Sequence, residues 1–108
     1  MYVEHNPKIN VFESRRFSKA LSKLSENVLI IVEDNIEKII ANPLIGEQKK
    51  GDLAHIRVHK FSVNKQQVLL GYSYAAQKLE IYLLSFSSHE NFYNDLKKQR
   101  SVDLKLLS

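Results

Sequence analysis

The feature that most constrains the fold is a change in the spacing of apolar residues near the middle of the chain. Before Asn42-Pro43, apolar side chains recur at the spacing of an amphipathic helix, and beyond Gly51 they alternate with polar side chains, as on a half-buried strand. Proline drives the residue before it out of the helical region, so the helical part ends at Asn42. A chain of 108 residues is long enough for one hydrophobic core and too short for two. The pattern predicts a single α+β domain over residues 1–108.

Two helices are predicted before the change of spacing, at about residues 14–24 and 26–41. The second has a broad apolar face, with its charged residues elsewhere on the helix surface. Because the link between them is short, we expect the two helices to form a hairpin that covers one face of a sheet. Residues 1–12 are expected to be an extended lead-in, with Val3, Ile9, Val11 and Phe12 available for a strand or for packing.

The second half of the chain predicts a small antiparallel sheet of three to four strands, because its strands are joined by short turns. The strands expected there cover residues 54–59, 68–74 and 79–86. The last of them is apolar on both faces, so we expect it in the interior of the sheet. Tyr72 and Tyr74 share a strand face with apolar neighbours, which favours core packing. A C-terminal helix is predicted at about residues 88–100, and residues 101–108 receive no assignment.

Composition limits the binding partners and the cellular compartment that we expect for this chain. The net charge of +4 favours an anionic partner such as nucleic acid, although a charge of this size is equally common on domains without one. The absence of cysteine excludes disulfides and cysteine-ligated metals. The longest apolar run, Val28 to Val32, is far shorter than the roughly 20 residues that span a bilayer. The first residues lack the segments of a secretory signal, so we expect a cytoplasmic protein that does not associate with membranes.

The strongest chemical signal follows the last predicted strand. Ser87 and Glu90 have the spacing of a capping box, in which each side chain bonds a main-chain N–H of the first helical turn. A helix that begins there places His89 in its first turn and Tyr93 one turn later on the same face. The sequence therefore predicts that an imidazole and a phenol lie side by side at the end of the sheet.

The alternation of the first strand adds further candidates. His55, Arg57 and His59 are expected on one side of the sheet, opposite the apolar residues between them. RNA cleavage by the 2′-hydroxyl needs a base, an acid and positive charge at the phosphate, which imidazole and guanidinium groups supply near neutral pH. With His89 and with Tyr93 as a stacking or orienting group, these residues predict one RNA-cleaving site. Further candidate RNA or phosphate ligands are Lys49, Lys50, Lys60 and Lys65.

The histidines also allow other interpretations. A single histidine is more often an ordinary surface residue, and His5 is assigned that role. His55, His59 and His89 together could ligate a metal, but no carboxylate or cysteine at ligand spacing supports such a site. We therefore predict neither a metal nor a cofactor. The chain also has no phosphate-binding glycine loop and no Gly-x-Ser-x-Gly nucleophile motif.

The order of these motifs resembles the RelE/ParE superfamily of toxins from bacterial type II toxin–antitoxin modules. The resemblance runs from residues 11–21 through 42–46 and 51–61, and it is strongest at residues 83–97, which contain Ser87-Ser-His-Glu-Asn-Phe-Tyr93. It implies a helical hairpin on a small antiparallel sheet, a cognate antitoxin protein, and a metal-independent endoribonuclease that cuts translated mRNA on the ribosome. DNA would be contacted only indirectly, through the antitoxin complex.

The resemblance also implies roles for individual residues. His89 matches a histidine that takes part in proton transfer in the YafQ-like and HigB-like branches, and Tyr93 matches an aromatic position one helical turn later. His55, Arg57 and His59 match the basic first strand of the sheet.

One departure from the family pattern concerns charge stabilisation. Many RelE-type nucleases have an arginine in the strand that here spans residues 67–72, where this chain has none. Stabilisation of the transition-state charge would then depend on Arg57, Lys60 or Lys65.

Two alternatives remain open at this point. A ParE-like toxin that poisons DNA gyrase needs no acid or base, and it would damage DNA while leaving transcripts intact. An inactive toxin homologue that acts only through antitoxin binding, or a small nucleic-acid-binding module, would not arrest growth.

Overall fold

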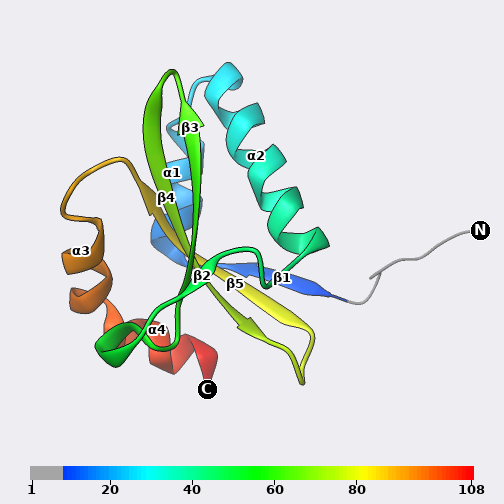
Figure 1. Cartoon of the computed structure of the whole chain (residues 1–108), viewed down its shortest axis with the longest axis vertical. Coiled ribbons are helices and arrows are strands. Elements are labelled where there is room, and N and C mark those ends of the chain that lie inside the picture. Colours follow the sequence, from blue (N-terminus) through cyan, green and yellow to red (C-terminus); the bar gives the residue numbers. More distant parts are fainter. Residues whose placement is uncertain (1–8) are drawn as a thin grey trace, which may run out of the picture.

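The computed structural model describes residues 9–108, which form one mixed five-stranded sheet with helices on both of its faces (Figure 1). In chain order the elements are β1 (Asn10–Glu13), α1 (Arg15–Ser22), α2 (Glu26–Ala41), β2 (Glu47–Gln48), the 3-10 helix η1 (Gly51–Leu53), β3 (Arg57–Val63), β4 (Gln66–Ala75), β5 (Glu80–Ser87), α3 (Phe92–Lys98) and α4 (Arg100–Leu107). The α+β class is confirmed. The sheet has one strand more than the largest number predicted, and it is not purely antiparallel. His5 and the first residues of the lead-in lie outside the described residues.

The helical hairpin is confirmed, and side-chain caps explain where its helices begin. The Ser14 hydroxyl accepts a hydrogen bond from the Phe17 N–H at 3.1 Å, and Ser25 accepts one from the Val28 N–H at 3.4 Å. Each cap satisfies a main-chain donor that the first helical turn leaves without a partner. Helix α2 ends at Ala41, directly before Asn42-Pro43, as the sequence predicts.

The strand order is β1-β5-β4-β3-β2, and the short edge strand β1 makes the sheet mixed. Strand β1 pairs in parallel with β5, whereas the other neighbouring strands pair antiparallel. Strand β5 lies between β1 and β4, which confirms that it is in the interior. The register shifts beside Gly71 and Tyr72, so Leu84 is an extra residue in β5.

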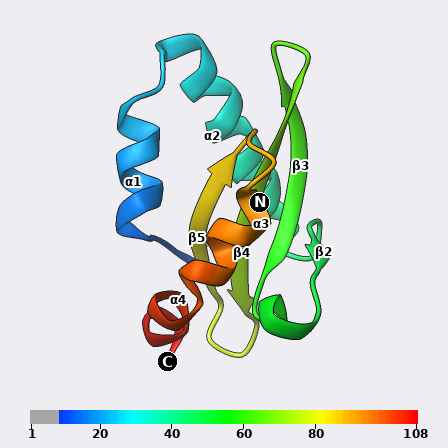
Figure 2. The same ribbon diagram turned by 90° about the vertical axis from the view of Figure 1, so that its left-hand side faces the viewer.

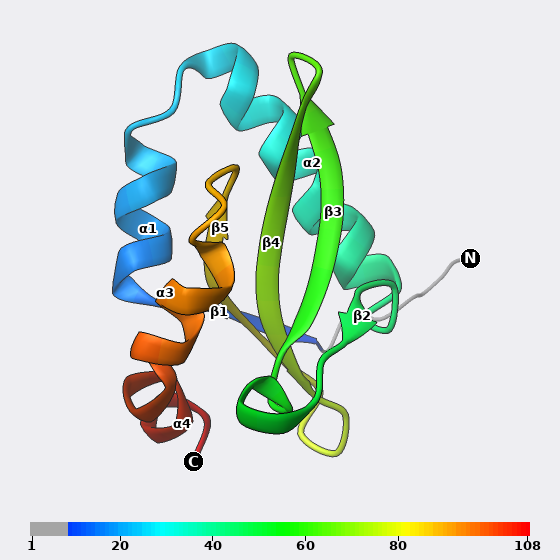
Figure 3. The same cartoon turned by 60° about the vertical axis from the view of Figure 1, so that its left-hand side comes forward.

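The sheet has a hydrophobic core on each face. The face toward the helical hairpin, called the hairpin face, buries Phe17, Ile39, Leu70, Tyr72, Ile81 and Leu83. The opposite face, called the open face, buries Leu53, Ile56, Val58, Leu84, Phe92 and Leu96. Tyr72 is wholly buried and Tyr74 packs at the edge of the first core, so the prediction for both tyrosines is confirmed. Figure 3 shows α2 behind the β3–β4 hairpin and α3 in front of the sheet, where it covers only part of the open face.

The C-terminal part differs from the prediction. The Ser87 hydroxyl accepts a hydrogen bond from the His89 N–H at 2.9 Å, two residues away, and α3 begins only at Phe92, so the predicted capping box is wrong. The unassigned tail forms a second helix, α4, which lies at the end of the molecule near the start of α1 (Figure 2). In the part of the chain that the structure describes, no helix has both the length and the apolar character that crossing a membrane requires.

Candidate functional site

His59 lies on the hairpin face and takes part in the packing of α2 against the sheet. Its Nε2 is 2.9 Å from Asn35 Oδ1 on α2, and its ring stacks on Phe61 with a centroid distance of 5.8 Å. Burial lowers the pKa of His59, and the nearby charge of Lys38 lowers it further. The neutral imidazole is therefore a structural partner of the buried Asn35 amide, which is a different role from the predicted one.

Arg57 lies on β3 and fastens the loop that follows α2. Its guanidinium donates to the carbonyl oxygens of Gly46 at 2.7 Å and Leu44 at 3.3 Å. Tyr72 holds the same loop from beneath, because its hydroxyl donates to the Pro43 carbonyl at 2.7 Å and accepts from the Gly46 N–H at 2.9 Å. The donors of Arg57 that face this loop are thus occupied by main-chain oxygens.

His55 lies before β3, in the turn that follows η1, and not on the strand as predicted. Its carbonyl accepts a hydrogen bond from the Ser73 hydroxyl. Its Nε2 is buried and has no hydrogen-bond partner among residues 9–108. Burial lowers the pKa of His55, and the nearby Asp103 carboxylate opposes that shift.

The structure therefore corrects the position of His55, which is not on β3, and gives Arg57 and His59 structural partners that the prediction of one wall with His89 did not include. His55 lies in the turn after η1, Arg57 lies under the loop that follows α2, and His59 lies under α2. Over the described range 9–108, no group of three or more His, Cys, Asp or Glu side chains is placed to hold a metal ion, so the three-histidine set is not formed.

His89 and Tyr93 do not share a helix face, because His89 lies in the loop between β5 and α3. His89 is exposed and lines a hollow on the side of the helical hairpin. Tyr93 lies on α3, packs edge to face on Phe92 and lines a different hollow. The imidazole and the phenol are thus at two separate places.

The hollow beside Tyr93 contains the candidate groups that the structure does bring together. Lys49 Nζ lies 5.1 Å from the centroid of the Tyr93 ring and 2.6 Å from Glu47 Oε1. The hydrogen bond to Glu47 is the main cause that raises the pKa of Lys49. This lysine–tyrosine hollow has a volume of about 330 Å³, between η1 and α3. Its walls are formed by Lys49, Lys50, Asp52, Leu53, Tyr93 and Lys97.

Lys97 was not among the predicted site residues, although its spacing from Tyr93 in the sequence indicates that the two lie on one helix face. It lies four residues after Tyr93, so both side chains project from the same face of α3. Lys49 and Lys50 come from the loop after β2 and Lys97 comes from α3, so three cations line the hollow that also contains the Tyr93 ring.

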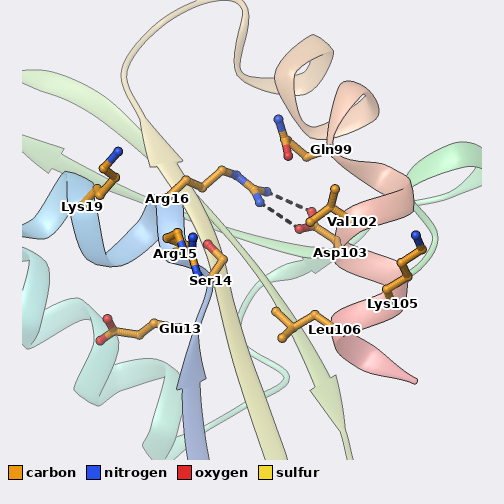
Figure 4. A pocket seen from close by; sticks show the side chains of 10 residues that line it. All are labelled: Glu13, Ser14, Arg15, Arg16, Lys19, Gln99, Val102, Asp103, Lys105 and Leu106. Atoms are coloured by element: carbon orange, nitrogen blue, oxygen red, sulfur yellow. Dashed lines mark hydrogen bonds and ion pairs between the residues drawn. The ribbon is translucent and has the colours of Figure 1, made fainter.

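A larger hollow, of about 550 Å³, lies between α1 and α4 (Figure 4) and shares no lining residue with the lysine–tyrosine hollow. Its wall includes an ion pair in which Arg16 Nη1 and Nη2 lie 2.8 and 2.9 Å from the two carboxylate oxygens of Asp103. Asp103 is the one buried residue of α4. This ion pair links α1, the first helix of the chain, to α4, the last helix.

Comparison with known proteins decides the family. The family model described as ParE-like toxin of type II bacterial toxin–antitoxin systems matches residues 11–97. The chain belongs to this family. No curated protein sequence matches the toxin.

Solved structures share the fold of the toxin at low sequence identity. A chain of the intact E. coli RelBE toxin–antitoxin complex superposes with a TM-score of 0.62 at 17% identity, covering 76% of the toxin and 98% of that chain. The isolated E. coli RelE toxin gives 0.59 at 16% identity, covering 83% and 97%. The free state of a RelE double mutant gives 0.62 at 16% identity, covering 88% and 95%. At this identity the likeness establishes the RelE-like fold.

The remaining cations of the toxin lie on the open face or at the hairpin turn. Lys60 shares the open face with Val58, and its charge helps to lower the pKa of Glu47, after the larger effect of Lys49. Lys65 is exposed in the turn between β3 and β4. Strand β4 contains no lysine or arginine, so it offers no cation to the open face.

Proposed function

We propose that this toxin is a ribosome-dependent endoribonuclease that cuts translated mRNA in the cytoplasm and is neutralised by a cognate antitoxin. The observation that supports this most is the lysine–tyrosine hollow, which Lys49, Lys50 and Lys97 line together with Tyr93. Single-stranded RNA is bound by cations along its phosphates and by aromatic rings on which its bases stack. The hollow combines both kinds of group on the face that the helical hairpin leaves free.

In this proposal the RNA continues from the hollow over the bare part of the open face. Lys60 projects from β3 there, and the cross-strand neighbour opposite it is Leu69 of β4. Lys60 would bind phosphate along this path on the open face. Lys65, in the β3–β4 turn directly before Gln66, lies closer in the chain to the hollow that His89 lines and would stabilise charge at the reacting phosphate.

His89 is the group that we assign to proton transfer. It is exposed, and its ring makes no hydrogen bond to any residue in 9–108, so it is accessible to a substrate. It would accept the proton of the attacking 2′-hydroxyl or donate one to the leaving 5′-oxygen, chemistry that imidazole performs near neutral pH. His59 and Arg57 have structural roles in the fold and are left out of this step.

Expression in a bacterial host tests the activity. The wild-type chain should arrest growth and produce new transcript ends, His89→Ala should reduce both, and co-expression of the neighbouring antitoxin should restore growth. Lys78→Ala is a matched control, because Lys78 is exposed in the turn before β5. Equal transcript cleavage by wild type and His89→Ala would remove His89 from the mechanism.

Binding of single-stranded RNA tests the hollow independently of cleavage. With purified His89→Ala toxin, the logarithm of the affinity should fall with the logarithm of the salt concentration with a slope of about −2 to −3, as expected for three to four neutralised phosphates. Lys49→Ala should make that slope about 0.7 less steep, and Tyr93→Ala should weaken binding about tenfold. Unchanged affinity in Lys49→Ala and Tyr93→Ala would refute the RNA face.

A ParE-like gyrase poison is the second candidate, and one observation favours it. His59 and Arg57 have structural partners, and β4 supplies no cation to the open face, so few groups are available for acid–base chemistry. Growth arrest with DNA damage and intact transcripts would support this candidate. An absence of growth arrest, together with tight antitoxin binding, would support an inactive homologue.

A further inference from the structure

A second hollow, near the tip of the β3–β4 hairpin, has no role in the function proposed above. It has a volume of about 300 Å³ and lies between α2, the β3–β4 hairpin and the end of β5. We call it the hairpin-tip hollow. It is lined by Leu24, Val28, Val32, Val63, Gln66, Val68, Phe86, Ser87, Ser88 and His89.

The lining has an apolar interior and a polar rim. Val32 and Val68 are 1% and 9% exposed, so they form a buried floor. Gln66, Ser88 and His89 are exposed, and their side chains have no hydrogen-bond partner within residues 9–108. Sites for small planar ligands have this composition, with apolar walls for contact area and a few polar groups that fix orientation.

Local structure fixes the rim on both sides. Asn64 and Lys65 have φ angles of 51° and 70°, the left-handed conformation of a tight two-residue hairpin turn, and Gln66 follows directly, paired with Val63. On the other side, the bond from the His89 N–H to Ser87 Oγ holds the loop that carries the imidazole. Gln66 and His89 are thus held at the rim by main-chain geometry.

We propose that the hairpin-tip hollow binds one nucleobase of the RNA substrate and that Gln66 reads its edge. The inference rests on the proposed function, since it places the base beside the group assigned to proton transfer. The Gln66 amide has both donors and an acceptor, so it can pair with the edge of an unstacked base. Lys65, the preceding residue, adds a positive charge for the attached phosphate.

The polar rim favours a nucleobase over an apolar side chain of a protein partner. A leucine or phenylalanine in the hollow would contact the valines but would leave Gln66, Ser88 and His89 without partners as they lose water. Buried polar groups without partners oppose binding, and a base supplies partners together with a flat apolar surface.

Direct binding of mononucleotides tests the inference without any need for cleavage. The 3′-monophosphates of adenosine, cytidine, guanosine and uridine are titrated into the isotope-labelled wild-type toxin, with inorganic phosphate as the reference anion. We expect at least one nucleotide to shift the amide signals of Gln66, Val68 and Ser88 when phosphate does not. Gln66→Leu should weaken that nucleotide about fivefold and reduce the difference among the four bases.

Gln77→Leu is the matched control, because Gln77 is exposed in the turn at the opposite end of β4. Its nucleotide affinity should equal that of the wild type. Val63→Trp, which narrows the hollow from the hairpin side, should abolish nucleotide binding while the circular dichroism spectrum is retained. The inference is overturned if nucleotides shift only the signals that phosphate shifts, if Gln66→Leu binds like the wild type, or if Val63→Trp impairs antitoxin binding alone. Failure of transcript cleavage with nucleotide binding intact would refute the proposed function and leave the hollow as a nucleobase site.

Discussion

The ion pair between Arg16 and Asp103 makes a sharp prediction about stability. Asp103 is the one buried residue of α4, and its carboxylate is wholly buried while both oxygens accept hydrogen bonds from Arg16. Asp103→Ala removes these bonds and leaves the Arg16 guanidinium, which lines the hollow between α1 and α4, without its partner. We expect this substitution to destabilise the toxin and to release α4 from α1.

The size of the effect follows from the burial of the two partners. Removing one member of a buried ion pair costs about 3–5 kcal/mol when the other charge stays buried. Arg16 is 28% exposed, so its guanidinium regains part of its hydration after Asp103 is lost. We therefore expect the free energy of unfolding to fall by about 2–3 kcal/mol.

Urea unfolding followed by circular dichroism measures the loss, and amide hydrogen exchange shows whether α4 loses protection. Asp34→Ala on the exposed side of α2 is the control and should change the free energy by less than about 0.5 kcal/mol. The pair Arg16→Met with Asp103→Leu should regain most of the lost stability, because apolar groups of similar volume can replace a buried ion pair. The reasoning is refuted if Asp103→Ala unfolds with the wild-type free energy and α4 keeps its protection.

Three further predictions concern the loop after α2 and the half-buried histidines His55 and His59. Tyr72→Phe should cost about 2–3 kcal/mol in urea unfolding, because it leaves the Pro43 carbonyl and the Gly46 N–H buried without a partner, and an unchanged midpoint would contradict this. Gly46→Ala should cost about 1–3 kcal/mol, since the new methyl group would lie 2.8 Å from Tyr72 Cε1, and wild-type stability would contradict the close fit. Burial lowers the folded-state pKa of His55 and His59 below 6.5, so the unfolded chain binds more protons as the pH falls. The free energy of unfolding should therefore be highest above about pH 7 and should decrease as the pH falls through 6.5. The decrease should be smaller in His59→Gln. Equal free energies of unfolding at about pH 7.5 and 5.5 would contradict this prediction.

The elements that could be predicted are those with a long, regular apolar pattern. Helix α2 spans the predicted residues because sixteen residues repeat one face and a serine and a proline mark its ends. For β1 the sequence predicts only an extended segment available for a strand or for packing, because its four residues are all exposed and it is held by parallel pairing with β5, far along the chain. Helix α4 lacks an apolar stripe, and its one buried residue depends on Arg16, 87 positions earlier.

The capping box failed for a related local reason. A serine hydroxyl can bond a main-chain N–H two or three residues later, and sequence spacing does not decide between these choices. Ser87 bonds the His89 N–H, so the chain makes a turn where a helix was expected and α3 starts at Phe92. His89 is left in an exposed loop as a result, which is also why it does not share a face with Tyr93.

The alternation of β3 correctly separates two sets of side chains, but it does not identify which face is free. In a sheet with a single core, the apolar set faces that core and the polar set faces water. Here both faces have cores, so Val58 is buried under α3 while His59 is half-buried under α2. A polar group that faces a core must find a partner, and Arg57 and His59 do so with a loop and a helix. Apart from Lys60 of β3, the groups proposed to act on a substrate therefore come from outside this strand, from the loop that carries His89, from the loop after β2 that carries Lys49 and Lys50, and from Lys97 of α3.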